Sequence, residues 1–291
     1  MKYAVIFRCQ EEFDISVMCD VLRVSRSGYY SWCLRDTSLR EQKKHRVQRE
    51  IEMIFQGSRQ IYGSPRVYEV LKGKGSDVGV DTVARYMREM GLRSKTKKKH
   101  RVVTTNSKHA HPVAENLLEQ NFTATRPNEI WLSDITYIAT GEGWLYLTSF
   151  MDLCTRLTVG WNLSTSLAHQ GVMSALDMAV KRQNPGPGVI VHSDRGIQYA
   201  CHEFRQKLEQ LHFIQSMSRK GNCYDNAPME SFFHTLKTEF VHHVAFQTIA
   251  EAKAALFEWI EIFYNRTRIH SSIGYKTPIA MEESYMLALA S

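Results

Sequence analysis

The spacing of apolar residues changes near residue 128, and before this point it predicts helices. Apolar residues recur every three or four positions over residues 47–56, which is typical of an amphipathic helix. A second helix is expected after Ser64 as its N-cap, with Pro65 in its first turn. A third is expected over residues 82–90, capped by Asp81. Short helices joined by tight turns favour two helix-turn-helix modules, although a helical linker bundle has the same pattern.

After residue 128 the apolar residues alternate or form short runs, which predicts strands. The strands are expected around residues 130–138, 144–152, 156–163, 189–192 and 214–218. Helical spacing returns over residues 167–182, 202–211, 227–242 and 250–264. Three consecutive strands followed by alternating helices and strands predict an α/β fold with a mixed sheet. The expected domains are two helical modules, a linker, a core and a helical extension, over residues 1–40, 41–101, 102–127, 128–245 and 246–291.

Composition excludes several classes of protein. Hydrophobic residues make up 43% of the 291 positions, enough for a sizeable core. The six cysteines contain no C-x-x-C pair, which argues against a zinc cluster and a disulfide framework. No apolar run reaches the roughly 18 residues of a membrane span, and the N-terminal apolar stretch is too short for a signal peptide. A cytoplasmic protein without a membrane partner is therefore expected.

The positive charge is concentrated in the N-terminal part. Residues 1–110 hold 23 Lys and Arg against 12 Asp and Glu, whereas residues 111–291 hold 14 against 18. This asymmetry favours a nucleic-acid grip over a basic surface that only aids solubility. Six cations fall within residues 93–101 and are expected to contact phosphates, with a solvated tail as the alternative. They are Arg93, Lys95, Lys97, Lys98, Lys99 and Arg101.

Three carboxylates are candidates for a metal site, although each also has an ordinary structural interpretation: an ion pair or an exposed sheet edge for Asp134, a turn or cap for Asp194, and a helix start for Glu230. Asp134 interrupts an apolar strand, so it needs a charged partner or a metal ion. Asp194 follows the strand over residues 189–192, and open α/β sheets place their sites at the carboxyl ends of strands. Glu230 opens a helix, with Asn226 as its expected cap, where a helix dipole would also favour an acid. Hard oxygen ligands of this kind suit a divalent metal ion such as magnesium.

These acids also carry a resemblance to a known family. Asp134, Asp194 and Glu230, with 35 residues between the last two, resemble the DDE triad of transposases and retroviral integrases. Nearly the whole chain is similar to the OrfB proteins of bacterial insertion sequences of the IS-three family. Ile197 departs from the pattern, because a small polar residue is expected there. The resembling stretches are residues 24–32, 62–66, 131–138, 192–199, 218–233 and 264–278.

The resemblance implies a ribonuclease H-like catalytic domain and a reaction. It implies DNA cleavage and strand transfer with two magnesium ions, for which manganese is expected to substitute. Asp134 and Asp194 would bridge both ions and Glu230 would hold one. The expected partners are double-stranded DNA, namely the terminal inverted repeats and the target, and further copies in a synaptic complex. An upstream OrfA segment, joined by frameshifting, is also expected because the sequence shows no heptad zipper, and the bacterial protein is expected at the nucleoid.

Further residues are assigned on the same basis. Lys237 lies seven residues after Glu230 on the same helix face, and the resemblance implies contact with terminal DNA. Weaker candidates for DNA contact are Lys220, Arg266 and Arg268. We expect core positions for Trp131, Trp144 and Trp161, and structural hydrogen bonds for His192 and His270. A non-enzymatic regulator with the same fold and a plain metal-dependent nuclease remain as alternatives; the intact triad argues against the first, and the basic modules with residues 264–270 argue against the second.

Overall fold

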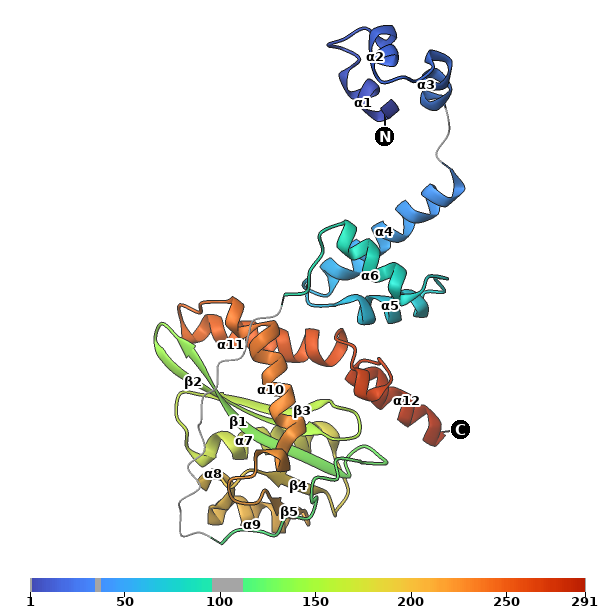
Figure 1. Cartoon of the computed structure of the whole chain (residues 1–291). Coiled ribbons are helices and arrows are strands. Elements are labelled where there is room, and N and C mark those ends of the chain that lie inside the picture. The colour runs from blue at the N-terminus through green and yellow to red at the C-terminus, as the bar shows by residue number, and fades with distance from the viewer. Residues whose placement is uncertain (1, 35–37, 96–111, 291) are drawn as a thin grey trace. The chain divides into compact units, whose positions relative to one another are not determined.

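The computed structural model describes residues 2–34, 38–95 and 112–290 (Figure 1). The cations Lys97, Lys98, Lys99 and Arg101 lie outside these ranges, so their expected contacts stay a prediction. The chain divides into two compact units, Met1–Met53 and Ile54–Ser291. Within the described residues, none of the helices combines the length and the apolar character that crossing a membrane requires.

The first unit is helical, as its apolar spacing predicts. It contains α1 (Lys2–Cys9), α2 (Ile15–Val21), α3 (Arg26–Cys33) and most of α4 (Leu39–Gly57). Asp14 caps α2 by accepting hydrogen bonds from Ser16 N and Val17 N. Ser25 caps α3 by accepting from Gly28 N at 3.1 Å. A small apolar core holds the three short helices together and consists of Ile6, Met18, Cys19 and Tyr29.

The second unit begins with a helical pair whose caps differ from the prediction. α5 (Ser64–Gly73) starts at Ser64 itself, so Gly63 is the N-cap and Ser64 is not. α6 (Val80–Glu89) likewise has Gly79 as its N-cap, and Asp81 is a first-turn residue. Both predicted caps were wrong because the helices start earlier than the polar residues suggest. An acid in the first turn still stabilises the helix through its dipole.

A five-stranded mixed sheet forms the centre of the second unit, and it confirms the ribonuclease H-like fold. The strand order is β3-β2-β1-β4-β5. β1 pairs antiparallel with β2, and β2 with β3, while β4 lies parallel to β1 and to β5. The strands are β1 (Ile130–Thr140), β2 (Gly143–Asp152), β3 (Thr158–Ser164), β4 (Ile190–Ser193) and β5 (Ile214–Met217).

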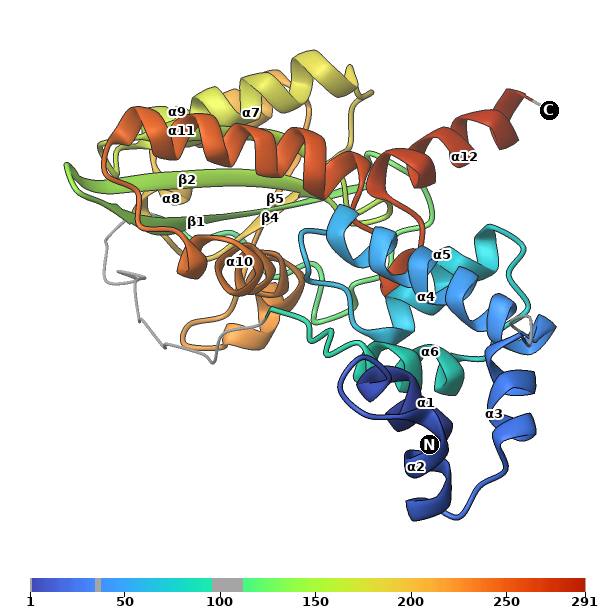
Figure 2. The same ribbon diagram turned by 90° about the horizontal axis from the view of Figure 1, so that it is seen from above.

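Helices cover both faces of this sheet, with α7 on one side and α10 on the other (Figures 1 and 2). The α7 side has a large apolar core that includes Trp131, Phe150 and Phe204. Because side chains alternate along a strand, Asp134 of β1 points to the opposite side from Trp131, toward α10. The helices are α7 (His169–Gln183), α8 (Ile197–Ala200), α9 (His202–Gln210) and α10 (Ala227–Glu239).

The C-terminal helices brace α10 and the outer strand β3. α11 (Ile249–Phe257) continues into a π-helical stretch, Glu258–Tyr264, where the sequence predicts only a regular helix. Tyr264 packs on Phe232 of α10, with 4.8 Å between ring centroids. Asn265 accepts a hydrogen bond from Thr158 N at 3.0 Å and donates to Thr158 O at 3.2 Å. The last helix is α12 (Pro278–Ala290).

The other outer strand, β5, is covered by the end of the predicted linker. Met217 N donates to Glu115 O at 3.2 Å, and Leu117 N donates to Ser216 Oγ at 2.9 Å. The residues just before the core are therefore attached to the sheet.

Of the three tryptophans predicted to lie in the core, two do and one does not. Trp131 and Trp161 are buried as expected, but Trp144 is 57% exposed, and its ring forms a T-shaped pair with that of Tyr137. A core position for Trp144 was wrong, because β2 extends there to the tip of the hairpin.

Candidate active site

The register of two neighbouring strands brings Asp134 and Asp194 together. In the parallel pairing of β1 with β4, Leu132 lies opposite His192 and Ser133 opposite Ser193. The next residue along the chain in each case is an aspartate, Asp134 within β1 and Asp194 directly after β4. Asp134 Oδ1 accepts a hydrogen bond from Ile135 N at 2.7 Å, and Asp194 Oδ1 accepts from Gly196 N at 2.9 Å. Both side chains are half-buried, and the backbone fixes the orientation of each.

Glu230 reaches the same region from the first turn of α10. Its side chain is exposed, and α10 packs across β1. Asn226, at the cap position as predicted, does not cap the helix with its side chain. Its Nδ2 donates instead to Ser133 O at 3.2 Å, next to Asp134 in the chain. The start of α10 is therefore bound to the strand that carries Asp134.

Asp225 holds the turn before α10, and no local pattern in the sequence singles it out. This carboxylate is fully buried. It accepts hydrogen bonds from Asn116 Nδ2 at 3.0 Å and Gln120 Nε2 at 2.9 Å. Arg219 donates to it through its backbone N, Nε and Nη2 at 2.8–3.0 Å. These bonds hold the pKa of Asp225 well below its usual range, with the Arg219 hydrogen bond as the largest cause.

His192 is a structural hydrogen-bonder, as predicted. Its Nε2 donates to Asp225 O at 2.8 Å, and its Nδ1 faces Ser216 Oγ at 2.8 Å. Burial lowers its pKa to about 4, so the ring is neutral near pH 7. The neutral tautomer with hydrogen on Nε2 fits both contacts, since a carbonyl can only accept. His192 thus ties β4 to the same turn that Asp225 holds.

The site concentrates negative charge. The pKa of Asp134 is raised well above its usual value, first by burial and then by the charges of Asp194 and Glu230. Ile135 N–H and Lys237 act in the opposite direction. Burial lowers the pKa of Lys237, and the charge of Asp134 opposes this shift. Asp194, Glu230 and Lys237 therefore all lie within electrostatic reach of Asp134.

The acids are near one another without forming a closed cage. Among residues 2–34, 38–95 and 112–290, no three His, Cys, Asp or Glu side chains are gathered tightly enough to hold one metal ion. Carboxylates repel one another, so a divalent cation is needed to draw them together. Their chemistry fits magnesium, because Asp and Glu supply hard oxygen donors and leave room for water and phosphate ligands.

The other predicted DNA-contact residues have different surroundings. Lys220 is exposed in the loop before α10, and Arg93 and Lys95 are exposed after α6. Arg268 is only 4% exposed and forms two hydrogen bonds to Glu239, at 2.7 and 2.8 Å. The prediction that Arg268 contacts DNA was wrong, because this guanidinium is buried in an ion pair.

Comparisons with known proteins agree with this architecture. An integrase core domain family matches residues 124–223, a second integrase core domain family matches residues 212–278, and an HTH-like domain matches residues 41–100. The "Insertion element IS600 uncharacterized 31 kDa protein" of Shigella sonnei is 47% identical over 92% of this chain and 98% of its own length. "Transposase InsF for insertion sequence IS3A" of Escherichia coli (strain K12) is 44% identical over 97% of this chain and 98% of its own length.

A solved structure, the HTLV-2 integrase catalytic core domain in complex with magnesium (trimeric form), is 15% identical. It covers 55% of this chain and 99% of that chain, with a TM-score of 0.43. This likeness is too distant to say more about the chain.

The mixed sheet and the matching families define a protein with an integrase-type core domain preceded by an HTH-like domain. The sequence identity and coverage of these two relatives are high enough to identify the family. The chain belongs to the IS3 family of insertion-sequence transposases.

Proposed function

We propose that the chain cleaves DNA at the ends of an insertion sequence and joins the freed strand to a second phosphodiester. Asp134, Asp194 and Glu230 are the catalytic carboxylates of this proposal. The observation that carries it is the register of β1 and β4, which makes the two aspartates neighbours at the point where α10 crosses with Glu230.

The residues of the site have different proposed roles. Asp134, Asp194 and Glu230 would hold magnesium, which when bound activates the attacking oxygen and stabilises the leaving one. We propose two ions, with manganese able to substitute. The backbone N–H groups of Ile135 and Gly196 fix the aspartates in orientation. Lys237 lies beside Asp134 and is suited to bind a DNA phosphate close to the reacting bond.

DNA binding is assigned mainly to the basic N-terminal part of the chain. We propose that the HTH-like domain binds the terminal inverted repeats, with phosphate contacts from Lys220, Arg93, Lys95 and the cations over residues 97–101. Lys220 belongs to the loop that leads to α10, so DNA there would also approach Glu230. Target DNA, additional copies of the chain and an upstream OrfA segment complete the proposed assembly, which works at the nucleoid.

Strand transfer in vitro tests this function. Purified chain is incubated with labelled DNA that carries the ends of the element, in magnesium, in manganese and in EDTA. Metal-dependent joined products are expected. Asp134→Asn, Asp194→Asn and Glu230→Gln should each lower cleavage by at least about a hundredfold, because each removes a carboxylate charge that would hold magnesium at the reacting phosphate. End binding should stay within about twofold.

Matched controls are Asp77→Asn and Glu209→Gln, which neutralise exposed acids away from the site. Both should retain wild-type cleavage. Hydrolysis without joining would instead support a nuclease, and binding without cleavage, with or without an OrfA segment, would support a regulator.

A further inference from the structure

Two stretches that carry the family resemblance contact each other in the second unit. Tyr62, from the Tyr-Gly-Ser-Pro-Arg stretch before α5, is 3% exposed. Its Oη donates to Thr267 O at 3.2 Å and accepts from Ile269 N at 2.8 Å. Thr267 and Ile269 belong to the segment that follows the π-helical stretch. The segment that leads into α5 and the C-terminal segment are therefore joined by a buried tyrosine.

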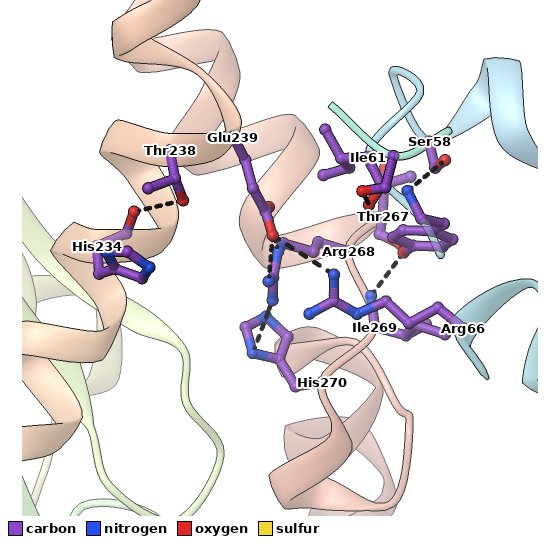
Figure 3. Close-up of polar contacts among 12 residues, drawn as sticks. Ser58, Ile61, Arg66, His234, Thr238, Glu239, Thr267, Arg268, Ile269 and His270 are labelled. Carbon is purple, nitrogen blue, oxygen red and sulfur yellow. Dashed lines mark hydrogen bonds and ion pairs between the residues drawn. The ribbon is translucent and has the colours of Figure 1, made fainter. Parts of the chain in front are cut away.

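Glu239 lies at the centre of the same contact (Figure 3). It is the last residue of α10, and its side chain is 9% exposed. Arg268 donates to its two carboxylate oxygens at 2.7 and 2.8 Å. Arg66 of α5 donates to Oε1 at 3.4 Å. One carboxylate thus bridges a guanidinium of the HTH-like domain and a guanidinium of the C-terminal segment.

Glu239 is the acid that these two guanidinium groups share, and the nearby His270 adds no charge. Burial lowers the pKa of His270 to about 2, and Arg268 and Arg66 add to the effect, so His270 is a neutral neighbour. The pKa of Arg66 is lowered by burial and by Arg268, and Glu239 opposes both. Without the Glu239 carboxylate, two guanidinium groups would face each other in a partly dry site. A buried ion network of this kind is sensitive to the loss of one partner.

α10 is therefore fixed at both ends. At its start, Asn226 is bonded to Ser133 O, beside Asp134. At its end, Glu239 is bonded to Arg268 and to Arg66 of the HTH-like domain. Glu230 and Lys237 lie on the helix between these two anchors. A shift of α5 would be transmitted to α10 through the Arg66–Glu239 pair.

We propose that Glu239 is a positioning residue and that the Arg66–Glu239 pair sets α10 relative to α5. DNA gripped by the HTH-like domain is then delivered to Glu230 and Lys237 in one geometry. This inference rests on the proposed function, since it assigns the pair a role in presenting DNA to the carboxylates. Neither residue touches the reacting atoms.

Arg66→Ala in the full chain is the principal test. Arg66 is 25% exposed, and its removal leaves the Arg268–Glu239 pair in place, so the variant is expected to fold. Hydrogen exchange should become faster both in α5 and in the last turns of α10, because both lose the shared ion pair. Lys72→Ala, which removes an exposed cation from the same helix, is the matched control and should change neither. Faster exchange in α5 alone would overturn the proposal.

Kinetics and salt dependence supply the second readout. Arg66→Ala should slow cleavage of end DNA by about tenfold or more, because small misplacements of reacting groups are costly. Binding affinity and its salt slope should not change, and Arg66→Lys should restore most of the rate. Arg66→Ala in a Glu239→Gln background should add nothing further. A salt slope smaller by about 0.9 would overturn the proposal, because it would make Arg66 a phosphate ligand.

The two proposals fail in different ways. If the wild-type chain does not cleave, the proposed function fails, while hydrogen exchange still decides whether Arg66 couples α5 to α10. If cleavage occurs but Arg66→Ala leaves it unchanged, the positioning role fails and the function stands.

Discussion

Asp225 and Glu230 belong to the same short stretch, yet one is buried and the other is exposed. Asp225 places its charge against Arg219, Asn116 and Gln120, and this ion pair organises the turn. Glu230 lies one turn into the helix that the turn begins. The buried Asp225 thus helps to fix the position of the exposed Glu230, as groups behind a site commonly orient the groups that form it.

The structural role of Asp225 predicts a dependence of stability on pH. Its pKa is lower in the folded chain than in the unfolded chain, where about 3.9 is usual. The folded state therefore binds fewer protons, and the stabilisation is complete above about pH 4 and is lost as the pH falls toward the folded pKa. Wild-type melting temperature should drop over this range.

Asp225→Asn should remove that part of the pH dependence and cost about 2 kcal/mol near neutral pH, because buried donors lose their charged acceptor. Thermal melts of both proteins between pH 2 and 7 would measure the difference. Parallel curves for the two proteins would contradict the role assigned to Asp225.

At the level of elements, the strands of the fold could be predicted and several contacts could not. The β1 pattern revealed Asp134 as a polar residue in an apolar strand, since alternation depends only on neighbouring residues. The helix starts at Ser64 and Asp81 were misplaced because a polar residue near a helix start fits the cap and the first turn equally well. Arg268 and Asp225 are buried with partners far away in the chain, and no local pattern reveals such partners.

Residues 264–270 show the same limit for the site. Tyr264, Asn265 and Arg268 are buried and serve packing and hydrogen bonding. Their burial does not test the expectation that this stretch favours strand transfer over hydrolysis, which stays a prediction. The three candidate carboxylates could be selected from spacing and resemblance, whereas the hydrogen bond from Asn226 to Ser133 O beside Asp134 required the three-dimensional structure.

The attachment of Asn265 to β3 predicts a loss of stability. Asn265→Ala removes both hydrogen bonds to Thr158 and leaves its buried N–H and C=O without these partners. The free energy of unfolding should fall by about 2–3 kcal/mol, measured by urea denaturation. The control is Gln206→Ala on the surface of α9, which should change the free energy of unfolding by less than about 0.5 kcal/mol. Asn184→Ala is unsuitable as a control, because residue 184 has a left-handed backbone conformation that would strain an alanine.

For the whole molecule, the uneven charge predicts how DNA binding responds to salt. The N-terminal part carries the net positive charge, and the part with the sheet is mildly acidic. Replacing Lys97, Lys98 and Lys99 with Gln should weaken binding to any DNA sequence and reduce the salt slope by about 0.9 for each phosphate that is no longer neutralised. Fluorescence anisotropy at several salt concentrations would measure both. Lys181→Gln with Lys253→Gln, from the acidic part, should leave the slope unchanged.

One backbone position on each outer strand of the sheet is already bonded, and this has a consequence for how copies of the chain can meet. Asn265 occupies the backbone of Thr158 on one outer strand, and Glu115 occupies Met217 N on the other. Exposed strand edges are templates for pairing with another chain and for aggregation. With these positions occupied, a strand from a second molecule cannot extend the sheet there. If copies of the chain gather at high local concentration, edge-to-edge pairing is therefore hindered at these two positions, which lowers the risk that their sheets fuse into a continuous β structure.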